Sequence, residues 1–287
     1  MDSARSLRPG DGEYPEQLTR IPGAPASLWL RGQLGRPVAR VAVVGSRDAD
    51  EYGRDMARRL ARGLVRAGVS VVSGGARGVD AAAHQGALEA GGHTVVVLAG
   101  EVERPTPQGN DDLFSRILAA GGGLVSEYDA GTPPLPFRFV ERNRIVSGMS
   151  DAVVVVRAGR GSGALLTAAF ARDQRRPLLA VPGDADHPLS EGPLQLLREG
   201  AHLAAGAHDV LGCLGLAPGQ QQELALGEVA PSARALLGAL AASPRHVSEV
   251  ARAAGRTVGE ALVGLLALEL DGLCEQRPGQ RFVRRGA

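Results

Sequence analysis

The stretch VSVVSGGARGVDAAAHQGALEAGG (69–92) decides the fold class. It opens with a run of apolar and small residues, which is typical of a strand buried on both faces of a parallel sheet. Glycines follow, and then an alanine-rich segment that indicates a helix closed by glycines. Glycines between a strand and a helix let the backbone approach a ligand, and a helix N-terminus favours an anion. We therefore predict a strand–turn–helix unit whose turn binds something negatively charged.

The same alternation continues on both sides of this unit. Further strands are predicted at 38–47, 93–100, 122–128, 151–159, 176–184 and, weakly, 202–204. Helices are predicted at 48–68, 112–120, 161–174 and 192–201, and residues 136–150 are predicted to form a loop that leads into a helix. The near-continuous valine and leucine strands favour an α/β fold: a Rossmann-like, doubly wound, mostly parallel sheet covered on both faces.

The sequence divides into four regions. Residues 1–37, irregular and rich in Pro and Gly from position 7, are predicted to be an N-terminal extension packed on the Rossmann-like domain at 38–216. The stretch 217–231 has the composition of a linker. Residues 232–287 contain three predicted helices and a hairpin with a Pro-Gly turn, which together indicate a small C-terminal winged-helix domain.

Composition limits the classes of function. The net charge is only +1, and all 32 basic residues are arginine, so phosphate binding would need a local patch rather than a global basic field. No apolar run is long enough for a membrane helix, and the N-terminus lacks the pattern of a signal peptide. Cys213 and Cys274 lie far apart without metal spacing, and the histidines show no ligand pairs. We expect a cytoplasmic protein without membrane contact, disulfides or metal.

Small, polar and basic residues gather where five predicted strands end, at 45–47, 73–80, 126–129, 159–168 and 180–184. Because open α/β sheets bind ligands beyond the carboxyl ends of their strands, we expect these turns to form one pocket. The candidate residues are Gly45, Ser46, Arg47, Ser73, Gly74, Gly75, Arg77, Gly78, Ser162, Gly163 and Thr167. For any single turn the alternative is structural: the glycines make tight turns, and Ser162 and Thr167 cap a helix. The turns match neither GxxxxGK[ST] nor GxGxxG, so no nucleotide cofactor is expected.

The segment FRFVERNR (137–144) carries a second signal. Two phenylalanines lie beside three arginines in a chain with 3% aromatic residues. Arginines with aromatic rings suit single-stranded nucleic acid, through phosphate contact and base stacking. The candidates are Phe139, Arg142, Asn143 and Arg144. The alternative is a buried phenylalanine pair beside surface arginines.

Three further residues are candidates for supporting the pocket. Asp80 and His84 are four apart and could share a helix face as an acid/base pair. The favoured alternative makes Asp80 a helix N-cap and His84 a structural or pocket-lining residue. Glu127 suits a catalytic or a structural role equally.

The ordered series of motifs resembles the DNA-processing protein A (DprA, also called Smf) family. The matching stretches are VAVVGSR, the YG at 52–53, SGGARGVDAAAHQGAL, VSEYDAG, FVERNRIVSGMSDAVVVV, SGALLTAAFA, AVPGD and SEGPLQLLREGA. The similarity covers about residues 14–214 and, more weakly, the tail. It implies a homodimer that binds single-stranded DNA, loads RecA onto incoming strands during natural transformation, and catalyses no reaction. Single-stranded DNA-binding protein is a further implied partner. By motif, the DNA pocket carries over to Arg47, the 73–80 turn, Arg142 and Arg144.

Several positions depart from the family pattern. Arg157 and Ala158 stand where the family usually has Glu-Ala, Arg104 replaces a tyrosine, Val140 replaces a proline, and Gly75 widens its turn. The chain begins close to the extension, so we expect no SAM-like N-terminal domain. Two other functions are weighed: a nucleotide phosphoribohydrolase-like enzyme on a related fold, and a winged-helix regulator that binds duplex DNA. The first lacks its PGGxGTxxE motif, and the third tail helix lacks base-reading side chains after Arg256.

Overall fold

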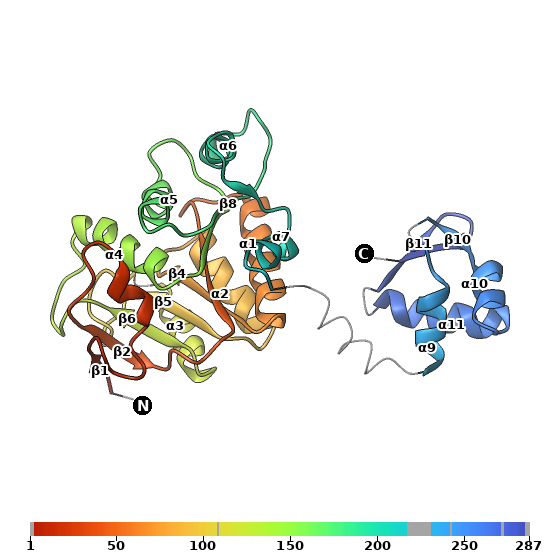
Figure 1. Ribbon diagram of the computed structural model, residues 1–287, viewed down its shortest axis with the longest axis horizontal. Helices are drawn as coiled ribbons and strands as arrows, with labels where there is room; N and C mark the ends of the chain where they lie inside the picture. The colour runs from red at the N-terminus through yellow and green to blue at the C-terminus, as the bar shows by residue number, and fades with distance from the viewer. Residues whose placement is uncertain (1–2, 108, 217–230, 242, 271–272, 285–287) are drawn as a thin grey trace. The chain divides into compact units, whose positions relative to one another are not determined.

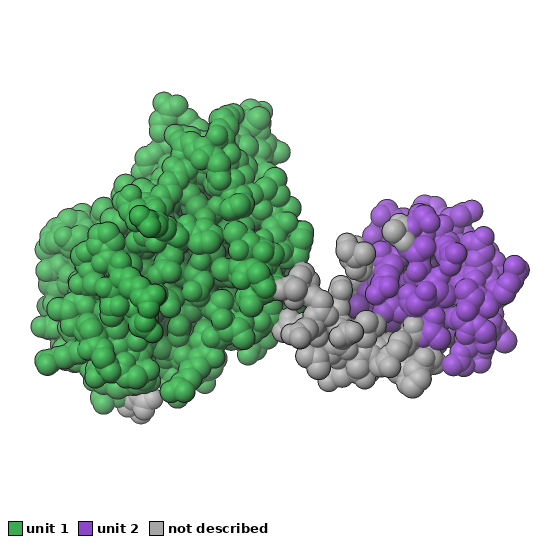
Figure 2. Space-filling view, viewed as in Figure 1, with its two compact units in different colours: residues 1–218 green, residues 219–287 purple. Residues whose placement is uncertain are grey.

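The computed structural model describes residues 3–107, 109–216, 231–241, 243–270 and 273–284. The chain divides into two compact units, residues 1–218 and 219–287 (Figure 2). Most of the predicted linker at 217–231 lies outside the described residues. Within the described residues, no helix is long and apolar enough to cross a membrane.

A nine-stranded sheet with the order β1-β2-β6-β5-β4-β3-β7-β8-β9 forms the first unit (Figure 1). Its strands are β1 (Arg5–Leu7), β2 (Leu28–Gly32), β3 (Ala39–Val44), β4 (Val69–Gly74), β5 (Thr94–Val97), β6 (Gly123–Ser126), β7 (Ala152–Val155), β8 (Leu178–Ala180) and β9 (His202–Leu203). The strands from β3 to β9 pair in parallel. The chain builds outward from β3 to β6 and then crosses to β7 on the other side of β3. The strand order therefore reverses between β3 and β7, which is where open α/β sheets bind ligands.

Helices cover both faces of this sheet, as the sequence predicted. They are η1 (Glu16–Arg20), α1 (Glu51–Arg66), α2 (Val79–Glu89), α3 (Asp111–Ala119), α4 (Pro136–Gly148), α5 (Gly163–Asp173), η2 (Pro188–Ser190), α6 (Glu191–Arg198) and α7 (Ala207–Cys213). Successive side chains of β3 point to opposite faces: Val41 and Val43 pack in one core with α1, α2 and α7, while Ala42 and Val44 pack in another with α4, α5 and η1. Both faces are apolar, which explains the unbroken valine runs in the sequence.

Two predicted segments differ from the structure. The region 7–37 is not wholly irregular, because β2 pairs antiparallel with β6 and extends the sheet. Its Leu28 and Leu30 are fully buried, so a strand of alternating burial lies within the Pro- and Gly-rich composition. The segment 136–150 is helical from its first residue, so the loop predicted at its start is replaced by α4. Pro136 occupies the first turn of α4, where its missing N–H costs nothing.

The second unit contains helices and a small sheet. Its described elements are α9 (Pro231–Ala239), β10 (Arg245–His246), α10 (Val247–Ala253), α11 (Val258–Leu270), β11 (Cys274–Arg277) and β12 (Arg281–Arg284). The predicted hairpin is present, and β10 joins it as a third strand in the order β10-β12-β11. Buried side chains that include Leu265 and Phe282 form its core. This is a winged-helix arrangement.

Candidate nucleic-acid interface

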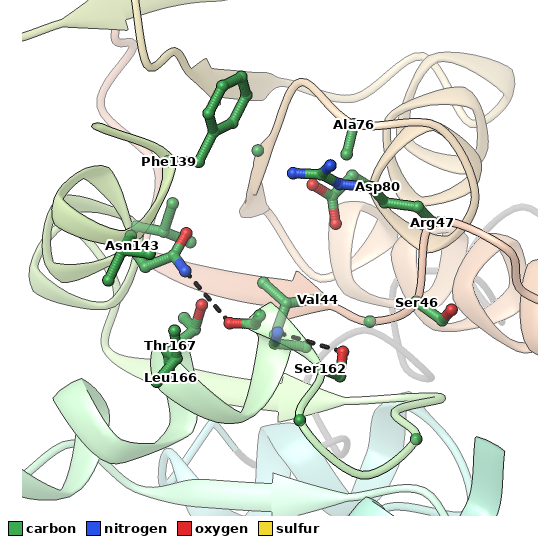
Figure 3. A pocket seen from close by; sticks show the side chains of 18 of the residues that line it. Val44, Ser46, Arg47, Ala76, Asp80, Phe139, Asn143, Ser162, Leu166 and Thr167 are labelled. Carbon is green, nitrogen blue, oxygen red and sulfur yellow. Dashed lines mark hydrogen bonds between the residues drawn. The ribbon is translucent and has the colours of Figure 1, made fainter. Parts of the chain in front are cut away.

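A pocket of about 660 Å³ opens at the carboxyl ends of β3 and β7, where the strand order reverses. Figure 3 shows Arg47, Asp80 and Ala76 across the pocket from Phe139 and Asn143, with Ser162 and Thr167 on a third side. The lining includes Gly45, Ser46, Arg47, Gly74, Asp80, Phe139, Arg142, Asn143, Ser162, Gly163 and Thr167 from the predicted set. Ser73, Gly75, Arg77, Gly78, His84, Glu127 and Arg144 do not line it. The structure thus brings together the turns after β3, β4 and β7 with one face of α4.

The turn after β3 holds an exposed cation of the pocket. The Ser46 N–H donates to the carbonyl of Arg157 over 2.6 Å, and the Ser46 carbonyl accepts from the Val79 N–H at 3.2 Å. These bonds anchor the turn to β7 and to α2. The side chain of Arg47 is exposed, and its guanidinium carbon lies 5.3 Å from the ring centroid of Phe139. Arg47 is therefore free to meet an anion while its guanidinium contacts an aromatic ring.

The turn after β4 supports this arrangement more than it lines the pocket. Gly78 has a φ of +79°, and a Cβ there would overlap the carbonyl oxygens of Ser46 and Arg47. Ser73 is buried and donates to the Val43 carbonyl over 2.6 Å. Gly75 packs near Leu98. The predicted glycine turn thus packs closely against neighbouring backbone. Of its glycines, Gly74 lines the pocket.

Arg77 points to solvent rather than into the pocket. Its Nη2 lies 2.8 Å from Asp48 Oδ1, and both side chains are more than 70% exposed. An ion pair this exposed contributes little to stability. Sequence could not foresee the pairing, because Asp48 lies 29 positions away in the chain.

A buried carboxyl group and a buried guanidinium group form the floor of the pocket. Asp80 of α2 and Arg142 of α4 are both more than 90% buried, and Arg142 Nη1 donates to the Val97 carbonyl over 2.5 Å. Burial raises the pKa of Asp80 to about 6, while Arg142, Ser73, the Ala76 backbone N–H and Arg47 oppose that rise. Burial likewise lowers the pKa of Arg142, and Asp80 counters this effect. The charge of the pocket floor therefore depends on the ionisation of Asp80.

The favoured role of Asp80 as a helix N-cap is wrong. Gly78 is the N-cap of α2, and Asp80 lies inside the first turn. Its side chain lines the pocket (Figure 3). A helix first turn also favours a carboxylate there.

His84 is a structural residue and does not line the pocket. It is fully buried, its Nε2–H donates to the Gly74 carbonyl over 2.9 Å, and its Nδ1 lies 2.7 Å from Thr94 Oγ1. Burial lowers the pKa of His84 to about 4, so the imidazole is neutral at pH 7. With both ring nitrogens engaged, His84 holds the turn at Gly74 and does not form an acid/base pair with Asp80.

The N-terminus of α5 closes a third side of the pocket. Ser162 caps this helix, and its hydroxyl accepts from the Ala164 N–H at 3.4 Å. Asn143 is buried and donates through Nδ2 to the Gly163 carbonyl over 3.1 Å, which ties α4 to α5. Thr167 is buried and lies one turn into the helix. Free amides at a helix N-terminus form a site for an anion such as phosphate.

Arg144 and Glu127 form a separate cluster away from the pocket. Arg144 Nη2 lies 2.5 Å from Glu127 Oε1, and both side chains are mostly buried. Arg144 Nε also donates to the carbonyl of Gly23 over 2.9 Å. This cluster joins α4 to the end of β6 and to the N-terminal segment, so both side chains have structural contacts where the sequence predicted pocket roles.

The sequence did not single out the apolar wall of the pocket. This wall consists of Pro136, Val140 and Leu166, together with the predicted Phe139. Val140 and Leu166 are each more than 40% exposed. Both lie within motifs that were recognised, but Leu166 lies in a predicted helix, where an apolar residue is ordinarily assigned to the core. Val140 was noted only because it replaces a proline.

Arg157, one of the departures from the family pattern, is buried next to the pocket. Its Nη2 lies 2.8 Å from Asp50 Oδ2, its guanidinium carbon lies 4.5 Å from the ring centroid of Tyr52, and it donates to Ser190. Asp50 is also the N-cap of α1, where it accepts from the Gly53 N–H. The arginine thus connects the end of β7 to the helix that follows β3.

Comparisons with known proteins agree across nearly the whole chain. The family model described as DNA recombination-mediator protein A matches residues 5–215, and the DprA winged helix domain matches residues 220–280. A putative DNA processing protein DprA of Mycobacterium tuberculosis H37Rv is 39% identical over 304 residues, covering 99% of this chain and 78% of that protein. Protein Smf of Escherichia coli K12 is 40% identical over 207 residues, covering 71% of this chain. The match spans 55% of that relative's length.

Solved structures give the same assignment. DNA processing protein A of Streptococcus pneumoniae superposes with a TM-score of 0.67 at 35% identity, covering 72% of this chain and 73% of that one. The protein of the same name from Helicobacter pylori, whose structure concerns its single-stranded DNA binding mode, gives 0.65 at 27% identity, covering 75% and 98%. The strand order, the match over residues 5–215 and these relatives lead to one assignment: the chain belongs to the DNA recombination-mediator protein A family.

Proposed function

We propose that this chain binds single-stranded DNA in the pocket and acts as a recombination mediator during natural transformation. The observation that supports this most is the meeting of exposed Arg47, buried Arg142 and the N-terminus of α5 around one cavity. Each of these groups favours a phosphate. The H. pylori relative, a DNA processing protein A with a single-stranded DNA binding mode, supports the same ligand.

The two kinds of wall suit the two parts of a nucleotide. Cations and backbone amides from the turns after β3 and β7 would take the phosphates. The apolar wall, with Phe139, Val140 and Leu166, would take the bases. Bases of a duplex are paired and stacked inside the helix, whereas those of a single strand are free to stack on protein rings. The proposed pocket therefore favours an unpaired strand, and its affinity should depend little on base sequence.

We propose binding without chemistry. Asp80 is held among arginines in the pocket floor, and both ring nitrogens of His84 are occupied by the fold. Neither is arranged as a general acid or base toward a substrate in the cavity. Release of a free base from a nucleotide would contradict this part of the proposal.

The proposed partners follow from the family. We propose that the chain loads RecA onto the bound strand, works beside single-stranded DNA-binding protein, and acts as a homodimer in the cytoplasm. RecA filament formation on strands coated with single-stranded DNA-binding protein, with and without this protein, measures the loading step. Sedimentation velocity measures the dimer.

The binding test compares two arginine variants of equal charge. Arg47→Ala removes a pocket cation, whereas Arg172→Ala removes an arginine that pairs with Glu199 and does not line the pocket. Fluorescence anisotropy with oligo-dT and with a duplex is measured at two salt concentrations. Arg47→Ala should weaken binding and lower the salt slope by about one, and Arg172→Ala should change neither. Wild-type affinity in Arg47→Ala would refute the proposed site.

A further inference from the structure

An exposed aromatic ring lies just outside the pocket. Phe137 is the second residue of α4 and is 54% exposed, whereas Phe114 and Phe282 are almost fully buried. A single exposed apolar side chain is ordinary on a protein surface. The contacts that hold this ring are what distinguish it.

Phe137 belongs to a group in which one guanidinium contacts two aromatic rings. The guanidinium carbon of Arg138 lies 5.4 Å from the ring centroid of Phe137 and 4.9 Å from that of Tyr128. Arg138 donates to the Pro133 carbonyl, and the Tyr128 hydroxyl donates to Glu141 Oε2 over 2.9 Å. We call Tyr128, Arg138 and Phe137 the α4 stack. Its inner members are fixed by hydrogen bonds, so the outer ring is supported without being covered.

The α4 stack also carries the positive charge of Arg138. No carboxylate among the described residues lies within ion-pair distance of Arg138. This separates it from Arg144 on the same helix, which pairs with Glu127. An aromatic face beside an uncompensated guanidinium combines base stacking with attraction for phosphate.

The α4 stack lies between pocket-lining residues in the chain. Pro136 lines the pocket and precedes Phe137 in the chain, and Phe139, two residues later, also lines it. Phe137 and Phe139, two positions apart, project from nearly opposite sides of α4, so Phe139 lines the cavity and Phe137 is exposed across the helix. A strand that leaves the pocket around the N-terminal end of α4 meets Phe137 next.

We propose that the α4 stack is a second platform for an unpaired nucleobase, placed one step outside the pocket. This rests on the proposed function, because it concerns the path of the same DNA strand. The platform adds affinity only for strands long enough to extend beyond the cavity. Its ligand is a base of any identity, because every base has a face that can stack.

The test uses Phe137→Leu and the control Phe137→Tyr, which keeps an aromatic ring. Affinities are measured for a series of oligo-dT lengths, and a 2-aminopurine base is moved along the strand to report stacking by its fluorescence. Phe137→Leu should weaken the binding of long strands about fivefold and leave the affinity for the shortest binding strands unchanged. It should also abolish the quenching of 2-aminopurine at one position. Phe137→Tyr should behave as wild type.

Arg47→Ala, measured in parallel, separates this inference from the proposed function. Wild-type affinity and quenching in Phe137→Leu, with weakened binding in Arg47→Ala, would overturn the platform and leave the pocket standing. Wild-type binding in Arg47→Ala would refute the pocket itself. A loss of self-association in Phe137→Leu with unchanged DNA binding would make the α4 stack a protein contact and overturn the proposal.

Discussion

Arg144 pairs with Glu127 over 2.5 Å, and this ion pair directs the arginine away from the cavity that Arg142 enters. The two arginines lie two positions apart on α4, so they project from nearly opposite sides of the helix. The stretch RNR (142–144) thus serves two purposes. Arg142 adds charge to the pocket floor, and Arg144 binds α4 to the N-terminal segment through the carbonyl of Gly23.

Substituting Arg144 should therefore change protein stability, whereas substituting a pocket arginine such as Arg142 should change DNA affinity. Arg144→Gln should lower the free energy of unfolding by about 1–2 kcal/mol, because it leaves the mostly buried Glu127 without its cation. Its affinity for oligo-dT should stay within about twofold of wild type, since the side chain does not reach the pocket. Urea denaturation checks the stability loss, and fluorescence anisotropy checks the affinity. A large affinity loss in a variant of normal stability would show that Arg144 contacts DNA.

Asp80 predicts a pH dependence of DNA binding. Its pKa is raised to about 6, so the carboxyl is mainly ionised at pH 7.5 and mainly protonated at pH 5. Protonation removes one negative charge from the pocket floor, so oligo-dT should bind more tightly at pH 5. One charge at about 4 Å in water changes the binding free energy by about 1 kcal/mol, which is roughly fivefold.

Asp80→Asn is the matched control for this pH effect. It should bind at pH 7.5 as wild type binds at pH 5 and lose the dependence between those values. His84 does not confound the measurement, because its pKa is lowered to about 4 and it stays neutral over this range. An equal pH dependence in Asp80→Asn would assign the effect to another group.

Titration of Asp80 should also make the free energy of unfolding of the unbound protein depend on pH, in a direction that its pKa shift fixes. A pKa raised from 3.8 to about 6 on folding means that the folded state holds the proton more tightly. Asp80 therefore contributes stability below pH 4, and this contribution is lost as the pH rises through 6. The lowered pKa of His84 has the opposite sign, because its contribution is present above pH 6.5 and is lost as the pH falls toward 4. Urea unfolding of Asp80→Asn between pH 4 and 7 isolates the first contribution.

Gly74 and Gly163 offer a matched pair of pocket glycines. A Cβ at Gly74 would overlap the Arg142 guanidinium and the Asp80 carboxylate, whereas a Cβ at Gly163 would meet nothing within 4 Å. Gly74→Ala should lower the free energy of unfolding by about 1–3 kcal/mol and weaken DNA binding by displacing the pocket floor. Gly163→Ala should leave the stability unchanged or slightly increased, because alanine favours a helix start more than glycine does. Equal behaviour of the two variants in thermal unfolding would contradict this packing.

Arg157 predicts the largest loss of stability. Arg157→Ala should cost about 3 kcal/mol, because it leaves Asp50 and Ser190 without a buried partner. Arg160→Ala is the control: this arginine pairs with Glu191 while 88% exposed, and its loss should cost less than about 1 kcal/mol. Guanidinium unfolding of both variants checks the difference. A loss below 1 kcal/mol in Arg157→Ala would show that the cluster relaxes around the missing side chain.

The sheet could be predicted from sequence because its strands are apolar on both faces and end in glycine turns. The same logic predicted the pocket turns, since parallel strands bring their carboxyl ends to one edge. The sequence could not predict that Arg142 lines the pocket and Arg144 does not. This depends on where α4 begins, which sets the side of the helix from which each arginine projects. β2 was missed because its partner β6 lies nearly a hundred residues away, and local composition carries no trace of that pairing. The sequence favoured a structural or pocket-lining role for His84, and only its burial in the fold decides between the two.

The pocket draws its walls from stretches near residues 45, 75, 140, 162 and 189, and no local segment builds it alone. A chain that has reached only β6 can already pair β3 with β4, yet it lacks α4, β7 and the start of α5. Ligand affinity should thus emerge late, after the chain has returned across β3 and closed contacts of long sequence separation. Binding by this unit is consequently a sensitive gauge of whether its folding has run to completion.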